Sequence, residues 1–195
     1  MHWRPPSVGK FILLSVLAAV TLASDVPGRY GHCAIVFGGH MIIYGGRGAI
    51  RRGSTQSIIT LGDTWALHFE NDEWVRLSDG SGEGDPAPRS SHTCSLVNPS
   101  GATNDGGMLV FGGSARSAST EVATVVADVW HLSLRENSAG RFQPSDITWS
   151  QLQPSGVPPS PRFDHSSVAY RNGLLVYGGC LTSTAFDDIW LLEYT

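Results

Sequence analysis

The chain has 195 residues, 41% of them apolar and 23 of them glycine, which is enough for one domain with a core and favours an all-β fold with many turns. Its formal net charge of −4 and its dispersed arginines argue against nucleic-acid binding. Lys10 is the only lysine, so a chain cleaved after residue 23 has neither a Schiff-base lysine nor a P-loop lysine.

Residues 1–23 have the pattern of a secretory signal peptide. Arg4 and Lys10 precede the apolar segment 11–23, and small residues lead to a cleavage position before Ser24. The alternative, a membrane anchor, would need a longer apolar segment to cross a hydrocarbon core of roughly 30 Å. Cleavage removes 2 of the 13 basic residues and none of the 17 acidic ones, which gives a mature charge of 11 − 17 = −6. We therefore expect a secreted or lumenal protein of residues 24–195 with no membrane span.

Four segments then recur in the same order along the chain. Each unit opens with Arg-x-x-His and an apolar strand, continues with an apolar run that ends in Gly-Gly, and proceeds to Asp-x-Trp-x-Leu; two units end with Trp-x-x-Leu. The arginines and histidines of the opening segment are Arg29, His32, Arg89, His92, Arg162 and His165. The glycine pairs are Gly45-Gly46, Gly112-Gly113 and Gly178-Gly179. The tryptophans are Trp65, Trp130 and Trp190 in the third segment and Trp74 and Trp149 in the fourth.

The units span about 29–88, 89–161 and 162–195, and each predicts four short antiparallel strands, except that the third lacks its Trp-x-x-Leu segment. The runs before Gly-Gly are apolar at every position, which predicts strands that are buried on both faces. A sheet of this kind must stack on a neighbouring sheet, and sheets of like twist stack radially into a propeller. Gly38-Gly39 has no counterpart among the repeated pairs and predicts a hairpin turn.

This order of segments resembles the kelch repeat, and GVPPSPRFDHSSVAYRNGLLVYGG, residues 156–179, is similar to the opening of a kelch blade. The resemblance implies a β-propeller of four-stranded blades, in which the repeated Gly, Trp, Arg and His positions mainly hold the blades together. Leu67, Leu132 and Leu192 stand where kelch repeats usually have Tyr. About three units cannot close a ring, because propellers need roughly four to eight blades. We therefore expect an incomplete ring in a fragment, a truncated product, or a chain that completes the propeller by self-assembly.

The repeated histidines invite comparison with a metal site, but they recur at one place in different units and have no short-range ligand spacing. We predict a structural role for them and for Asp63, Asp128 and Asp188, which we expect to accept backbone N–H groups where a strand begins. The regular spacing of the tryptophans predicts core positions rather than exposed platforms for sugars. The sequence predicts no catalytic residue, no metal ligand and no cofactor.

Three cysteines, Cys33, Cys94 and Cys180, have no CxxC spacing, so at least one of them is free, buried or paired with another chain. We favour three small buried side chains over a disulfide framework. Cys180 supports an alternative function, because some kelch-like propellers belong to extracellular copper-radical oxidases whose site contains a Tyr–Cys crosslink. No matching Tyr/His cluster is apparent in the sequence.

The units carry long insertions at 47–62, 98–106 and 133–148, which predict loops on the faces of the propeller. Arg47, Arg51 and Arg52 make the first insertion a cationic tip on an acidic protein, and we expect it to contact an anionic partner. Scaffold and loops without a catalytic set favour a secreted or lumenal protein-interaction module over an enzyme. A non-functional truncated product is a third reading.

Overall fold

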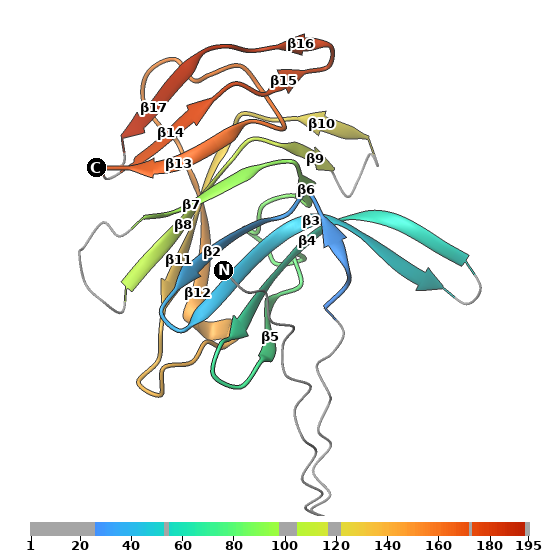
Figure 1. Cartoon of the computed structure of the whole chain (residues 1–195), viewed down its shortest axis with the longest axis vertical. Coiled ribbons are helices and arrows are strands. Elements are labelled where there is room, and N and C mark those ends of the chain that lie inside the picture. Colours follow the sequence, from blue (N-terminus) through green and yellow to red (C-terminus); the bar gives the residue numbers. More distant parts are fainter. Residues whose placement is uncertain (1–25, 53–54, 98–104, 117–121, 172, 194–195) are drawn as a thin grey trace, which may run out of the picture.

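The computed structural model describes residues 26–52, 55–97, 105–116, 122–171 and 173–193 (Figure 1). Within these ranges the chain forms antiparallel β-strands and one short 3-10 helix, so the all-β prediction is confirmed. The predicted signal peptide, residues 1–23, lies outside the described residues.

Three sheets form the body of the molecule and correspond to three propeller blades. Blade 1 has the order β2-β3-β4-β5, with strands β2 (Cys33–Phe37), β3 (His40–Arg52), β4 (Thr55–His68) and β5 (Glu73–Ser78). Blade 2 has the order β7-β8-β11-β12, with strands β7 (Thr93–Val97), β8 (Asp105–Phe111), β11 (Val129–Arg135) and β12 (Ile147–Leu152). Blade 3 has β13 (Ser166–Tyr170), β14 (Gly173–Tyr177) and β17 (Ile189–Glu193), and its described part contains no fourth strand. The blades fan out from their innermost strands without closing a ring (Figure 1), as predicted.

Short strands repeat at the junction between blades. In units 1 and 2 the opening arginine and the residue after it pair with residues that follow the glycine pair of the same unit, and in unit 3 the residue after the arginine does so. The elements involved are β1 (Arg29–Tyr30) on β3, β6 (Arg89–Ser90) on β9 (Ser114–Arg116), and Phe163 on β15 (Cys180–Leu181). Small hairpins continue outward through β10 (Ala123–Val125) and β16 (Thr184–Ala185), and the 3-10 helix η1 (Pro144–Asp146) precedes β12.

The insertion at 47–62 is a β-hairpin rather than the predicted loop. Strands β3 and β4 stay paired from Arg47 opposite Thr60 to Arg52 opposite Thr55, and this arm projects beyond the blade (Figure 1). A β-bulge between Tyr44 and Gly46 separates the arm from the blade. Cross-strand hydrogen bonds therefore extend the strands past the point where the apolar pattern ends.

The other two predicted loops are shorter than expected. Residues 98–104 lie outside the described chain, and residues 105 and 106 already belong to β8. In the third insertion, β11 continues to Arg135 and β12 begins at Ile147, so only residues 136–146 connect the strands.

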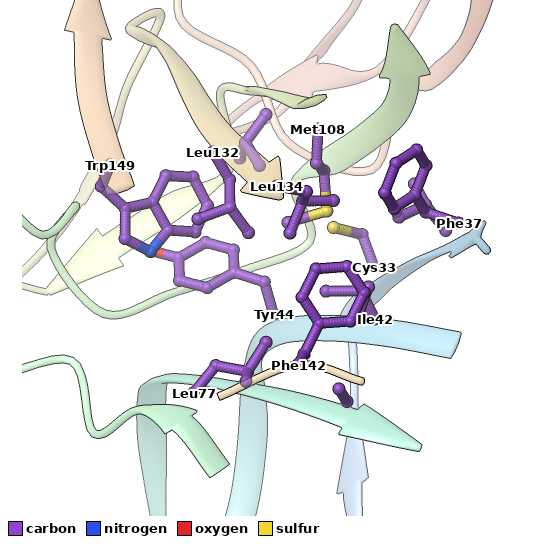
Figure 2. Packing of buried hydrophobic residues seen from close by; sticks show 13 residues of the cluster. Cys33, Phe37, Ile42, Tyr44, Leu77, Met108, Leu132, Leu134, Phe142 and Trp149 are labelled. Carbon is purple, nitrogen blue, oxygen red and sulfur yellow. The ribbon is translucent and has the colours of Figure 1, made fainter. Parts of the chain in front are cut away.

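The core lies between blades, in two clusters. The first joins blades 1 and 2, where Tyr44 and Ile42 face Met108, Leu132 and other side chains of blade 2 (Figure 2). The second joins blades 2 and 3. Strand β8 serves both, because Met108 and Val110 point to the first cluster while Leu109 and Phe111 point to the second. Alternation of side chains across a strand explains why its sequence is apolar at every position.

Candidate functional site: blade junctions and open surfaces

An arginine, an aspartate and a tryptophan form the same contact in all three units. Each opening arginine makes a bidentate ion pair with the aspartate of Asp-x-Trp, with shortest N–O distances of 2.7, 2.7 and 2.6 Å in units 1, 2 and 3. The indole N–H two residues later donates to that aspartate at 2.7 Å in every unit. The arginines are Arg29, Arg89 and Arg162, and the aspartates are Asp63, Asp128 and Asp188.

The arginine of this contact is the buried partner. Its side chain is 4%, 1% and 0% exposed in the three units, and it also donates to the carbonyl of the first glycine of its own pair. Buried charges are tolerated when they are paired and fully hydrogen-bonded, and this geometry meets both conditions. Hydrogen bonds from Arg162 and then from Trp190 hold the pKa of Asp188 well below its usual range.

The aspartate has partners that the prediction did not name. We expected backbone N–H groups, and a backbone hydrogen bond does reach the Asp188 carboxylate. In addition, the carboxylate binds two side chains that recur with it in every unit. The sequence carried part of this signal, because one arginine and one aspartate recur together in each copy, but their contact depends on how the two segments fold.

The two glycines of each pair have different neighbours, and both have positive φ. A methyl group on Gly45 would lie 2.7 Å from the carbonyl oxygen of Arg89, and one on Gly112 would lie 2.8 Å from that of Arg162. The first glycine therefore packs against the next blade. The second glycine packs against the histidine of its own unit, as Gly113 does against the Cβ of His92.

Two of the predicted histidines are buried where one blade meets the preceding one. The ring of His92 lies 5.1 Å from that of Tyr44, and the ring of His165 lies 5.1 Å from that of Phe111. A hydrogen bond of 2.8 Å joins His165 Nε2 to Thr93 Oγ1. Burial, and then the nearby Arg89, lowers the pKa of His92 to about 3. Burial, and then Arg162, lowers the pKa of His165 to about 4.

His32 holds the same place in unit 1 but is exposed at the open end of the array. Two of the three histidines thus lie in separate junctions, and the third lies at the open end. Within the described ranges, no group of three His, Cys, Asp or Glu side chains is arranged to hold a metal ion.

The five tryptophans fill two kinds of environment. Trp65 and Trp149 are buried, and Trp149 packs against Tyr44 with ring centroids 4.8 Å apart. Trp74, Trp130 and Trp190 are half-buried. Trp65, Trp130 and Trp190 lie in the equivalent strands β4, β11 and β17, and Trp74 and Trp149 lie in β5 and β12. Leu67 lies opposite Trp74, and Leu132 lies opposite Trp149.

The cysteines correct the preference for three buried thiols. Cys33 of β2 and Cys94 of β7 form a disulfide with their Cα atoms 5.7 Å apart. The bond joins the innermost strands of blades 1 and 2. Cys180, on which the copper-radical alternative depended, is a half-buried free cysteine in β15 opposite Ala185.

The face of blade 3 that points away from blade 2 is apolar and largely exposed in the described part of the chain. Five large side chains on it are 44–66% exposed: Val168, Tyr170, Tyr177, Ile189 and Leu191. Strand register places Tyr177 beside Ile189, and Leu175 beside Val168 and Leu191. At the other end of the array, Tyr30 and Val36 are 56% and 57% exposed.

Two grooves and the β3–β4 arm are further accessible surfaces. A groove of about 560 Å³ between residues 76–85 and 144–149 contains Asp79, Glu83 and Asp85. A groove of about 230 Å³ between blades 2 and 3 is mainly apolar. On the arm, Arg47 is exposed; the backbones of Arg51 and Arg52 pair with β4, and their side chains lie outside the described residues. Of the helical segments in the described chain, none is long and apolar enough to cross a membrane.

Comparison with known proteins gives one consistent result. Residues 17–195 match a family model described as the KLHDC2/KLHL20/DRC7 Kelch-repeats domain. The F-box/kelch-repeat protein At1g51550 of Arabidopsis thaliana is 29% identical over 186 residues, which cover 92% of this chain and 34% of that protein. The Rab9 effector protein with kelch motifs of Rattus norvegicus is 34% identical over 105 residues, which cover 53% of this chain and 23% of that protein.

A solved structure titled "Structure of YjhT" is similar to the chain with a TM-score of 0.48 and 20% identity, over 80% of this chain and 35% of that one. The chain therefore matches about a third or less of the length of these relatives.

Proposed function

The chain belongs to the kelch-repeat family, and from this premise we propose that it is a secreted or lumenal protein-interaction scaffold that binds through the segments between its strands. One observation carries the proposal. The buried Arg–Asp–Trp contacts tie the opening segment of each unit to its own blade, while the β3–β4 arm extends outside the blade into solvent (Figure 1). A rigid body with projecting segments is the usual arrangement of a binding scaffold.

The disulfide supports the secretory compartment. Disulfides persist in oxidising environments and are rare in the cytosol, and Cys33–Cys94 joins two blades in the interior of the protein. The test is maleimide labelling of the protein in its native source, followed by intact mass measurement. We expect one reactive cysteine before reduction and three after reduction and unfolding. Three labels without reduction would contradict the compartment.

The arm is the proposed contact with an anionic protein partner. Arg47 is exposed near its base, and the sequence adds Arg51 and Arg52 near its tip on a chain of net charge −4. Complementary charge of this kind accelerates association and selects partners. Exposed charge pairs contribute about 0.2–1 kcal/mol each. Loss of three such pairs should therefore weaken binding by about 0.6–3 kcal/mol, which corresponds to roughly 3-fold to 150-fold.

The experiment compares proteins captured from the secretory pathway by three baits. These are the wild type, the triple variant with Arg47, Arg51 and Arg52 changed to Glu, and the control Arg141→Glu, which reverses a 56% exposed arginine in another loop. We expect at least one acidic protein that is retained by the wild type and the control and is lost with the triple variant. Identical capture by all three baits would rule out the arm as the binding element.

Self-assembly is a second candidate, favoured by the uncovered ends of the blade array. Blade 3 exposes an apolar face. The equivalent face of blade 1 is buried against blade 2. We propose that the two ends bind each other between copies of the chain. Native mass measurement at several protein concentrations tests this, with a stable monomer as the contrary result.

A further inference from the structure

We propose that two copies associate head to tail, with the open face of blade 3 in each copy stacked on the open face of blade 1 in the other, to form a closed ring of six blades. This inference rests on the self-assembly proposed above and specifies which residues meet. The same contacts occur at both internal junctions. At the open ends, blade 3 has one partner of each contact and blade 1 has the other.

The first contact is a histidine on an aromatic ring. The ring of His92 packs at a tilt against Tyr44, and the ring of His165 packs edge-on against Phe111. Both aromatic residues directly precede a glycine pair. The next residue in this series is Tyr177, which is 54% exposed. The histidine that completes the series from the other direction is His32, which is also exposed. A copy joined head to tail brings these two side chains together.

The second contact is made by the first glycine of each pair. A methyl group would meet a carbonyl oxygen of the next blade at 2.7 Å from Gly45 and at 2.8 Å from Gly112. At Gly178 its nearest contact would be the carbonyl oxygen of Phe186 at 3.4 Å, within the same blade. All three glycines have nearly the same φ, +64°, +63° and +67°. Gly178 thus has the junction conformation without the junction neighbour, which in the ring is Arg29 of the second copy.

The third contact is a series of backbone hydrogen bonds that runs from blade to blade. Ser91 N–H donates to the carbonyl of Gly31 at 2.8 Å, and Asp164 N–H donates to the carbonyl of Ser91 at 3.0 Å. The three residues hold the same place in the opening segment and all have positive φ, 64°, 58° and 53° along the chain. In the ring, Gly31 N–H of one copy donates to the Asp164 carbonyl of the other, which continues the series.

The apolar surface agrees with these polar contacts. In blade 1, Ile35, Ile42 and Ala66 lie side by side and are buried against blade 2. The equivalent row in blade 3 is Val168, Leu175 and Leu191, of which Val168 and Leu191 are 57% and 44% exposed. Burial of this row requires a blade with an apolar face at the same spacing. On the corresponding face of blade 1, Val36 is 57% exposed, while the neighbouring pair Ile43 and Trp65 is only 3% and 7% exposed.

The number of blades fits closure. The described part of each copy contains three blades, so two copies bring six together, within the roughly four to eight that form propellers. The two new junctions are identical and related by a two-fold axis, so the assembly ends at the dimer if the rotation closes.

The disulfide supplies a direct test. Cys33 is the first residue after His32, and Cys94 is the second residue after His92. Their Cα atoms are 5.7 Å apart across the junction. The residues with the same offsets at the proposed junction are Ser166 and Ala34 of the second copy, both exposed. The variant with Ser166→Cys and Ala34→Cys, in a Cys180→Ser background, should therefore form an interchain disulfide in the full chain.

The expected product is a dimer of 2 × 20.9 = 41.8 kDa for the full chain, seen without reductant and lost on reduction. The matched control pairs Ser166→Cys with Val36→Cys, which is on the same face but roughly 7 Å farther along the strand. Each single-cysteine variant is a second control. The control pair should give at least about tenfold less dimer, because disulfides form only over a narrow range of Cα distances.

The outcomes separate the junction from self-assembly itself. A dimer on native sizing without selective crosslinking would refute the proposed junction and leave self-assembly standing. A monomer without crosslinks would refute both. A ladder of larger species would show that the junction forms but the ring does not close. As a second variant, Tyr177→Asp should shift the wild-type dimer to monomer, and an unchanged dimer would overturn the proposal.

Discussion

Alanine substitution at Gly112 and at Gly178 should lower the free energy of unfolding by different amounts. The two positions are equivalent, but only Gly112 touches a neighbouring blade in the single chain. Gly112 and Gly178 have φ of +63° and +67°, so a side chain at either position suffers the same backbone penalty of roughly 1–2 kcal/mol. At Gly112 the new methyl group would also lie 2.8 Å from the carbonyl oxygen of Arg162, and the blades must shift to relieve this overlap. Overpacking of this kind typically adds about 1–3 kcal/mol.

We therefore expect Gly178→Ala to lower the free energy of unfolding by about 1–2 kcal/mol and Gly112→Ala by about 2–5 kcal/mol. The measurement is urea unfolding followed by tryptophan fluorescence, at a protein concentration where the chain is monomeric. Both variants should keep the wild-type slope of the transition, so that the midpoints report stability alone. Equal losses at the two positions would show that the close approach of blades 2 and 3 does not constrain the glycine.

Two further predictions concern the interior. Because burial depresses the pKa of His92 and of His165, the unfolded chain takes up protons first as pH falls below about 6.5, and the folded state loses stability from there downward. Each pKa unit corresponds to about 1.4 kcal/mol, so unfolding at pH 5.0 should require about 4 kcal/mol less than at pH 7.5, and His165→Gln should remove about half of this difference; a flat profile would contradict burial of the neutral rings. Replacing both Cys33 and Cys94 by Ser should cost about 4 kcal/mol, as loop closure predicts for their separation of 61 residues, while Cys180→Ser should change stability by less than about 0.5 kcal/mol in the same urea assay. Equal effects of the two changes would mean that the disulfide does not constrain the unfolded chain.

The blades could be predicted from the sequence because their signals are local and repeat. Fully apolar runs identify strands that are covered on both faces, and β8 shows this, with Met108 and Leu109 in different clusters. Three copies of Gly-Gly and Asp-x-Trp fix the order of strands without any knowledge of the tertiary structure. The incomplete ring follows from the number of copies alone.

The remaining features depend on which strands become neighbours. Residues 47–60 are mostly polar, and their few apolar residues, Ala49, Ile50, Ile58 and Ile59, come in adjacent pairs rather than in the alternation of a half-buried strand. Their pairing in the arm therefore had no clear sequence signal. Cys33 and Cys94 stand at different offsets from their histidines, and only the stagger between β2 and β7 brings them together. The role of Asp63 as a partner of Arg29 likewise requires two segments 34 residues apart to meet.

The single covalent junction gives the chain an uneven tolerance of proteolysis. A cut in the connection between β5 and β6, residues 79–88, leaves blades 1 and 2 tethered through Cys33 and Cys94. A cut in residues 153–161, between β12 and the opening arginine of blade 3, leaves only non-covalent contacts to retain the last blade. Protein that is cut at both places would therefore keep its first two blades as one particle. It would lose the third blade, together with the apolar face that this blade exposes.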